Sequence, residues 1–139
     1  MMLSAVKLSN TLYVSRQPEL ADVAALAAEG FSVVMCNRPD GETADQPASV
    51  EMRKLVEAAG MLFVDYPVTP VTFPGPNLQK ISQVFSGDEG KVFAFCRTGT
   101  RCTNLWVASR PPSEREAAAA HALALGYDLT LANRFQESS

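Results

Sequence analysis

The sequence predicts an α/β domain, in which helices cover both faces of a mainly parallel sheet. Short apolar segments alternate with amphipathic segments of helical spacing through most of the 139 residues. The apolar segments lack a polar face, which is typical of strands that are buried on both sides. Apolar residues make up 47% of the chain, enough for a hydrophobic core, so we expect residues 1–139 to form a single domain.

The first half of the chain predicts two strands, each followed by a helix. Residues 11–15 (TLYVS) favour a short strand, and the helical spacing after Pro18 (ELADVAALAAEG) ends at Gly30, a residue suited to a helix C-terminus. Residues 31–36 (FSVVMC) form a β-branched apolar run that predicts a buried strand. The polar loop NRPDGETADQP follows, and a second amphipathic helix is expected over 49–60.

The second half repeats this alternation. We expect, in order, a strand over 61–68, a loop over 69–76 with three prolines, a helix over 78–85, a strand over 91–95, and two helices with the sequences TNLWVASR and PPSEREAAAAHALALGY. Ser113 and Glu116 have the spacing of a capping box at the start of the last helix. The pattern after Tyr127 favours no particular element.

Charge and composition exclude several classes of partner. The chain has 12 Lys and Arg against 15 Asp and Glu, so its net charge of −3 does not suggest nucleic-acid binding. No apolar segment reaches the roughly 20 residues of a membrane helix, and the N-terminal ten residues lack a signal-peptide core. Three cysteines without a disulfide pattern suggest reduced thiols, so we expect a cytoplasmic protein with no membrane partner. The sequence does not indicate its oligomeric state.

The segment VFAFCRTGTRCTNLW, residues 92–106, carries the candidate catalytic chemistry. Cys96 ends a predicted strand, and ligands of open parallel sheets bind at the carboxyl ends of strands. Backbone N–H groups at the start of the next helix would attract an anion and stabilise a Cys96 thiolate. Arg101 can hold two oxygens of such an anion with its planar guanidinium. The residues expected to line this anion site are Arg97, Thr98, Gly99, Thr100 and Cys102. A plain buried cysteine before a turn is the alternative.

Three polar residues follow the strand that ends at Cys36, and they are candidates for the rim of the site. Asp40 or Glu42 could supply a general acid, and Arg38 could be a second anion contact. A solvated turn explains the PDG segment on its own and is the interpretation we favour, and Arg38 is either the second anion contact or a surface charge.

The remaining cysteines and the single histidine support no cofactor. Cys36 fits a core position, although a disulfide with Cys96 on a neighbouring strand is an alternative. Cys102 could resolve an oxidised or persulfidated Cys96, or simply pack inside. There is no C-x-x-C pair, His121 has no partner ligand, and no glycine-rich nucleotide loop occurs, so we expect neither a metal nor a cofactor. Trp106 is expected to anchor the core.

The loop CRTGTR resembles the C-x-x-G-x-R loop of rhodanese-type sulfurtransferases. The segments QP (17–18), GFSVVMCNRPDGE (30–42), YPVTP (66–70) and FCRTGTRCTNLW (95–106) together resemble the beta-lactamase-hydrolase-like family with a protein-phosphatase-like domain. This resemblance implies a fold similar to the cysteine-based tyrosine and dual-specificity phosphatases. It also implies that Cys96 is a nucleophile that forms a covalent intermediate and that Arg101 binds the oxyanion.

The sequence departs from the phosphatase pattern C-x-x-x-x-x-R in four ways. The loop is one residue shorter, Phe95 replaces a histidine, Cys102 replaces a hydroxyl residue, and the loop over 69–76 lacks an acidic residue. Three functions therefore remain open: a cysteine-dependent hydrolase of phosphomonoesters, a sulfurtransferase that carries a persulfide on Cys96, and a non-catalytic anion-binding regulatory module. In each case the expected partner is a small anion, either a phosphate ester or a sulfur donor.

Overall fold

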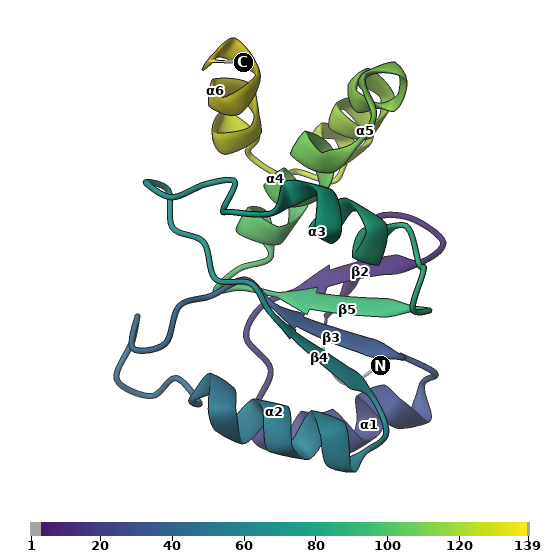
Figure 1. Cartoon of the computed structure of the whole chain (residues 1–139), viewed down its shortest axis with the longest axis vertical. Helices are drawn as coiled ribbons and strands as arrows, with labels where there is room; N and C mark the ends of the chain where they lie inside the picture. The colour runs from purple at the N-terminus through teal and green to yellow at the C-terminus, as the bar shows by residue number, and fades with distance from the viewer. Residues whose placement is uncertain (1–3, 139) are drawn as a thin grey trace.

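A five-stranded sheet of order β1-β2-β5-β3-β4 lies at the centre of the structure, a computed structural model that describes residues 4–138 (Figure 1). The strands are β1 (Val6–Lys7), β2 (Leu12–Ser15), β3 (Val33–Cys36), β4 (Leu62–Asp65) and β5 (Val92–Phe95). Only β1 is antiparallel to its neighbour, and the pairs β2 with β5, β5 with β3, and β3 with β4 are parallel. The predicted α/β fold with a mainly parallel sheet is therefore confirmed.

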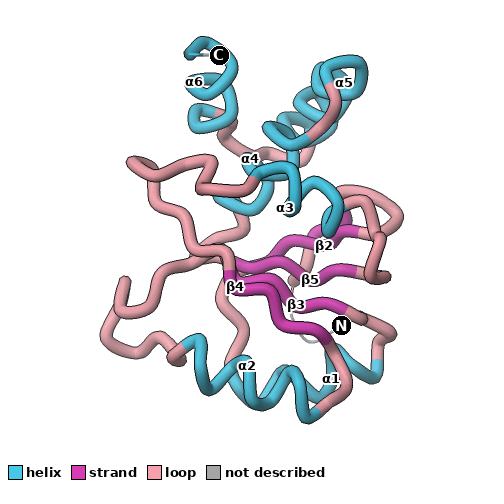
Figure 2. The backbone as a smooth tube through the Cα atoms, viewed as in Figure 1, coloured by secondary structure: helices cyan, strands magenta, loops and turns pink. Residues whose placement is uncertain are grey.

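Helices cover both faces of the sheet, as Figures 1 and 2 show. They are α1 (Val23–Ala28), preceded by a short 3₁₀ helix (Leu20–Asp22), α2 (Ser49–Ala58), α3 (Leu78–Phe85), α4 (Thr100–Ser109), α5 (Pro112–Ala124) and α6 (Thr130–Ser138). One face carries α1 and α2; α3 and α4 lie on the other, with α5 and α6 packed further out. Across residues 4–138, no helix combines the length and apolar character needed to cross a membrane.

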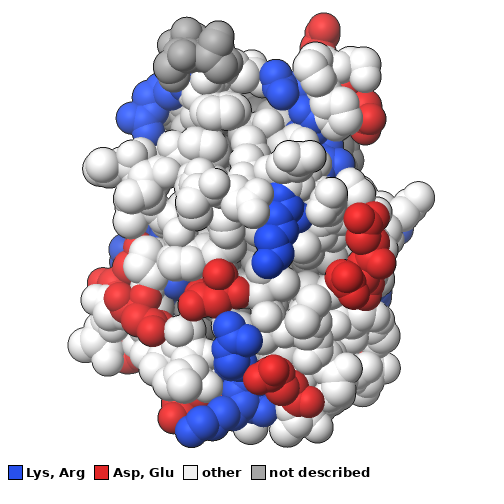
Figure 3. Space-filling view, in the orientation of Figure 1, with Lys and Arg blue, Asp and Glu red and all other residues white. Residues whose placement is uncertain are grey.

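The two central strands are buried along their whole length, which explains their continuous apolar sequences. In β5, Phe93 and Phe95 point to the core under α1 and α2, whereas Val92 and Ala94 point to the core under α3 and α4. Because side chains alternate along a strand, one apolar segment contributes to both cores. On the face in view in Figure 3, charged side chains of both signs are interspersed among neutral ones.

Three elements differ from the sequence-based expectation. Strand β1 was not expected, and α6 occupies the tail for which the sequence favoured no element. The predicted capping box of Ser113 and Glu116 is wrong, because α5 begins at Pro112 and has no side-chain cap. Proline at the first helical position has a suitable φ and no N–H that needs a cap, so the helix starts one residue before Ser113.

The register of the parallel strands determines where the candidate site lies. Phe95 of β5 is level with Ser15 of β2 on one side and with Cys36 of β3 on the other. The residues that follow these three strands therefore emerge next to one another at the same edge of the sheet. Cys96 is the first residue after the middle strand of the three.

Candidate active site

Cys96 lies at the carboxyl end of β5 and is almost completely buried, with 1% of its surface exposed. Its backbone N–H donates to the Ser15 carbonyl at 3.3 Å, which continues the pairing of β2 and β5. The Gly99 N–H points back at the sulfur, with a distance of 3.0 Å from N to Sγ. Gly99 has a φ of 90°, in the left-handed region that side chains disfavour, and this conformation turns its amide toward the sulfur.

The surroundings of Cys96 stabilise its thiolate. A hydrogen bond from the Cys102 thiol is the largest cause, and backbone groups of Cys102, Thr98 and Arg101 add to it. Burial opposes these contributions, but together they lower the pKa of Cys96 to about 6. Because α4 begins at Thr100, the sulfur also lies at the positive end of a helix. A pKa of about 6 favours the thiolate of Cys96 at neutral pH, and the thiolate is the form of a cysteine that can act as a nucleophile.

Cys102 is a fully buried proton donor, with 0% of its surface exposed. Burial raises its pKa well above the ordinary value, and the hydrogen bond to Cys96 raises it further. Cys102 thus keeps its proton while Cys96 loses its own. Within the described chain no disulfide forms, and Cys36, Cys96 and Cys102 are all free thiols.

Arg101 extends from the first turn of α4 and is held in one orientation. Its Nη1 donates to Glu42 Oε2 at 3.0 Å and to the Val68 carbonyl at 2.9 Å, and its Nη2 donates to Glu42 Oε1 at 3.3 Å. These contacts use three of the five N–H donors of a guanidinium, which leaves Nε–H and one Nη2–H. A fork with two remaining donors can bind two oxygens of a tetrahedral anion.

Glu42 binds two arginines at once, since its Oε1 also accepts from Arg38 Nε at 3.0 Å. Burial by itself would raise the pKa of Glu42, but the hydrogen bonds from Arg101 and Arg38 outweigh it and lower the pKa. A carboxyl group that is held in its ionised form is a poor general acid. In this geometry the Glu42 carboxylate holds Arg101 through two hydrogen bonds.

Arg38 is not a surface charge, because only 4% of the residue is exposed. Its Nε binds Glu42, its Nη1 donates to Gln17 Oε1 at 3.0 Å, and its Nη2 donates to Thr43 Oγ1 at 3.1 Å. The buried Arg38 guanidinium therefore holds the Glu42 carboxylate that binds Arg101. Asp40 lies apart from this network, since its carboxylate accepts from the Ser49 N–H at 2.8 Å and from the Ser49 hydroxyl at 2.9 Å, at the start of α2.

The other predicted site residues lie around the same loop. Arg97 and Thr98 are exposed, and the Thr98 hydroxyl donates to the Thr100 hydroxyl at 3.2 Å. Cys36 does end the neighbouring strand β3, but burial raises the pKa of its thiol to about 12, and the thiol donates to the Arg38 carbonyl at 3.2 Å. Among residues 4–138, no group of three or more His, Cys, Asp or Glu side chains is placed to hold a metal ion.

Sequence spacing did not reveal the contacts that hold the two arginines. Gln17, Thr43 and the Val68 carbonyl come from three separate loops, and no pattern along the chain connects them with Arg38 or Arg101. Of these contacts, the ion pair between Arg38 and Glu42 is the one that sequence spacing could have suggested, because the two residues lie four positions apart. The loop over 69–76 folds on itself through hydrogen bonds between Thr69 and Thr72, and has no carboxyl group.

Comparison with known proteins shows which family this chain belongs to. Residues 5–113 match the family model described as beta-lactamase hydrolase-like protein, phosphatase-like domain. The chain belongs to this family. The beta-lactamase hydrolase-like protein of Agrobacterium fabrum is 35% identical over 105 residues, which are 76% of this chain and 24% of that protein. The chain therefore spans about a quarter of the length of the curated relatives it matches.

Solved structures agree with this membership of the phosphatase-like family. A candidate phosphatase from Neisseria meningitidis has a TM-score of 0.75 and 32% identity, with 96% of this chain and 97% of that chain covered. A Cys-to-Ser variant of P. aeruginosa TpbA in complex with pTyr has a TM-score of 0.60 and 17% identity, with 96% and 90% covered. The second likeness shows a shared fold only.

Proposed function

We propose that this chain is a cysteine-dependent phosphatase that cleaves a phosphomonoester through a thiol-phosphate intermediate on Cys96. The observation that carries the proposal is the Cys96 sulfur, which lies in a ring of backbone N–H donors, with its pKa lowered to about 6, in the same loop as the oriented Arg101. Membership of the phosphatase-like family supports a phosphate ester as substrate. The pTyr bound to TpbA, which shares the fold, favours an aryl phosphate.

The proposed reaction has two steps. The Cys96 thiolate attacks phosphorus, the bond from phosphorus to the ester oxygen breaks, and the alcohol leaves with a proton from water. Water then attacks phosphorus, the S–P bond breaks, and phosphate leaves while the thiolate is restored. The backbone N–H groups of the loop and the two remaining donors of Arg101 stabilise the charge on the phosphoryl oxygens in both steps.

Turnover of an aryl phosphate by the reduced protein tests this function. Wild type is expected to release the phenol, Cys96→Ser to fall to background, and Arg101→Lys to lose about a hundredfold or more, since lysine has one charge but no fork. Circular dichroism of both variants shows whether the fold is intact. A Cys96→Ser protein that retains turnover, or a folded wild type that has none, rules the phosphatase proposal out.

Sulfur transfer is a second candidate, which one observation favours. Four residues separate Cys96 from Arg101, as in the rhodanese-type loop, and a shorter loop makes a smaller anion site. The Cys96 thiolate would attack the outer sulfur of thiosulfate, the S–S bond would break, sulfite would leave, and Cys96 would hold a persulfide.

Intact mass after exposure to thiosulfate separates the candidates. A gain of one sulfur atom in wild type, but not in Cys96→Ser, supports sulfur transfer. A protein that gains no sulfur and turns over no ester, yet binds sulfate through Arg101, is the anion-binding module.

A further inference from the structure

A groove of about 730 Å³ lies beside the Cys96 loop, between that loop, the segment after β2 and the loop after β3. Arg97 belongs to the Cys96 loop and lines the groove together with Arg16, which directly follows β2. Because Ser15 and Phe95 are level in the parallel pair β2 and β5, Arg16 emerges next to Cys96. Two arginines from adjacent strand ends therefore border the groove where it meets the candidate active site.

These two arginines differ from the two that Glu42 binds. Arg38 and Arg101 are held by Glu42 and by further protein oxygens, whereas Arg16 and Arg97 are exposed. Among the described residues, neither Arg16 nor Arg97 forms an ion pair, and the one hydrogen bond of Arg16 is a long contact of 3.5 Å from Nη1 to the Gln17 carbonyl. Both guanidinium groups have donors available for a ligand.

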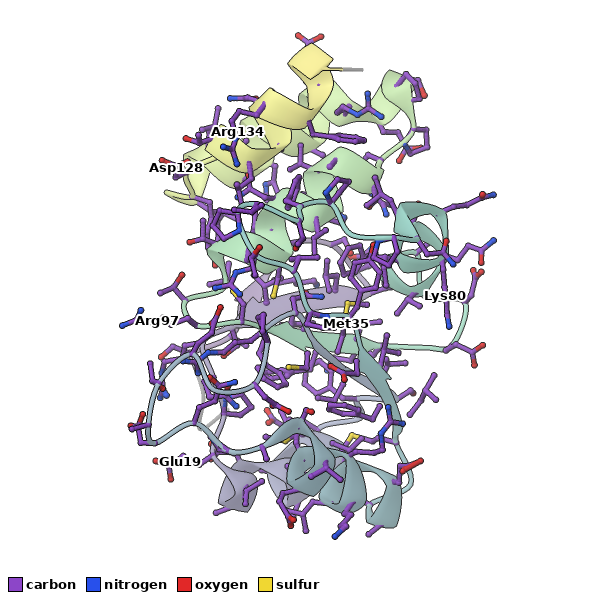
Figure 4. The ribbon with its side chains drawn as sticks, turned by 60° about the vertical axis from the view of Figure 1, so that its left-hand side comes forward. Glu19, Met35, Lys80, Arg97, Asp128 and Arg134 are labelled. Carbon is purple, nitrogen blue, oxygen red and sulfur yellow. The ribbon has the colours of Figure 1, made fainter. Side chains whose placement is uncertain are left out.

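Two carboxylates also line the groove and limit what it can bind. Asp45 accepts a hydrogen bond from the Thr43 hydroxyl at 2.9 Å, and Glu19 lies toward α1, away from Arg97, as Figure 4 shows. The carboxylates of Glu19 and Asp45 would repel a ligand with many negative charges. A single anionic group next to the Cys96 loop would meet the arginines first.

We propose that Arg16 and Arg97 form a subsite for a second anionic group, a carboxylate or a phosphate, on the substrate of Cys96. This inference rests on the proposed phosphatase function and narrows its substrate class to phosphate esters with one further negative charge. The reacting phosphoryl group occupies the loop of Cys96 and Arg101, and the second group lies in the groove. Charge-assisted hydrogen bonds to two guanidinium groups would hold it there.

Binding to Cys96→Ser, measured by titration calorimetry, tests the subsite without turnover. The probes are phenyl phosphate and 4-carboxyphenyl phosphate, which differ by one carboxylate. Two phosphotyrosine peptides, with Glu or Gln beside the phosphotyrosine, show whether the second charge can come from a peptide. We expect the carboxylated small molecule to bind about threefold to tenfold more tightly, a modest gain because both arginines are partly solvated.

Variants of Arg16 and Arg97 show whether these two residues cause the tighter binding of the carboxylated probe. Arg16→Gln and Arg97→Gln, each combined with Cys96→Ser, are expected to reduce the ratio of the two affinities, that for 4-carboxyphenyl phosphate over that for phenyl phosphate. The triple variant is expected to abolish this preference, and because the preference is a ratio, any loss of affinity that both probes share cancels. Lys80→Gln on α3 is the matched control, since it removes one exposed cation on the opposite side of the molecule in Figure 4. It is expected to keep the preference.

The outcomes separate the subsite from the proposed function. If phenyl phosphate binds and the carboxylate adds nothing, or if the preference persists without both arginines, the subsite is wrong while the phosphatase proposal stands. If only the carboxylated probe binds, through Arg16 and Arg97, the subsite stands and phosphoester recognition by the Cys96 loop fails. If neither probe binds to the folded protein, both are wrong.

Discussion

The Glu42 carboxylate and the Arg101 guanidinium meet through two hydrogen bonds of 3.0 and 3.3 Å, although 59 residues separate them along the chain. Glu42 belongs to the loop after β3, and Arg101 to the first turn of α4. The loop after one strand therefore determines the orientation of an arginine that follows the neighbouring strand. Because Arg38 is buried behind Glu42, the carboxylate has little freedom to turn away.

Glu42→Gln is expected to weaken anion binding and turnover about tenfold, because an amide cannot accept both hydrogen bonds from Arg101 or balance its charge. It should also lower the free energy of unfolding by about 1–3 kcal/mol, since Arg38 loses its ionic partner in a buried position. Sulfate affinity, aryl phosphate kinetics and urea unfolding measure these effects.

Asp40→Ala is the matched control from the same loop. It removes the carboxylate that accepts from Ser49 at the start of α2, which should cost about 0.5–2 kcal/mol of stability. Anion affinity and turnover should remain as in wild type. If Glu42→Gln and Asp40→Ala lose turnover equally, the hydrogen bonds from Arg101 to Glu42 do not contribute to turnover.

The reactivity of Cys96 should follow its lowered pKa. Alkylation of wild type by iodoacetamide, located by peptide mass spectrometry, is expected to rise with pH with a midpoint near 6, the pKa of Cys96. The sign follows from the thiolate being the reactive form: below pH 6 Cys96 is protonated and slow, and above it the rate levels off. Cys36, with a pKa of about 12, should react little in this range.

Variants of Cys102 test the cause of this shift. Cys102→Ala removes the hydrogen bond that contributes most to it, so the midpoint should move to higher pH. Cys102→Ser keeps a donor at the same position and should move it less. A wild-type midpoint near 8.5, the value of a free thiol, would contradict the stabilised thiolate.

Gly99→Ala tests the backbone conformation of the loop. A Cβ at Gly99 would lie 3.5 Å from the Ser15 backbone, an ordinary contact, so the main cost is the φ of 90°, about 1–2 kcal/mol. Strain there should turn the N–H away from Cys96 and lower turnover at least tenfold. Gly126→Ala is the control: it has a φ of 96° and open space, so it should lose similar stability and keep full turnover.

The rate of ester cleavage should depend steeply on the leaving group. The loop over 69–76 carries no carboxyl group that could protonate the departing oxygen, so good leaving groups should react much faster than poor ones. A series of substituted phenyl phosphates, and one alkyl phosphate, measures this dependence through kcat/KM. A flat dependence would indicate that a general acid reaches the site from another segment.

Much of the fold followed from local patterns. Continuous apolar segments marked β3 and β5, because strands buried on both faces have no polar side, and helical spacing marked α1, α2 and α3. The strand β1 is only two residues long and exists through its pairing with β2, so local sequence carried almost no signal for it. The start of α5 was misplaced because a proline competes with a capping pattern.

The sequence by itself determined the chemistry that can occur: a cysteine at the end of a buried strand, a glycine turn and an arginine within six consecutive residues, 96–101. Only the tertiary structure decided that Glu42 holds Arg101 and that Arg16 emerges beside Cys96, because in each pair the two residues follow different strands. The carboxyl ends of parallel neighbours meet at one edge, and hydrogen bonds across that edge join residues far apart in the chain. A contact between two such loops depends on strand order and register, which no short stretch of sequence encodes.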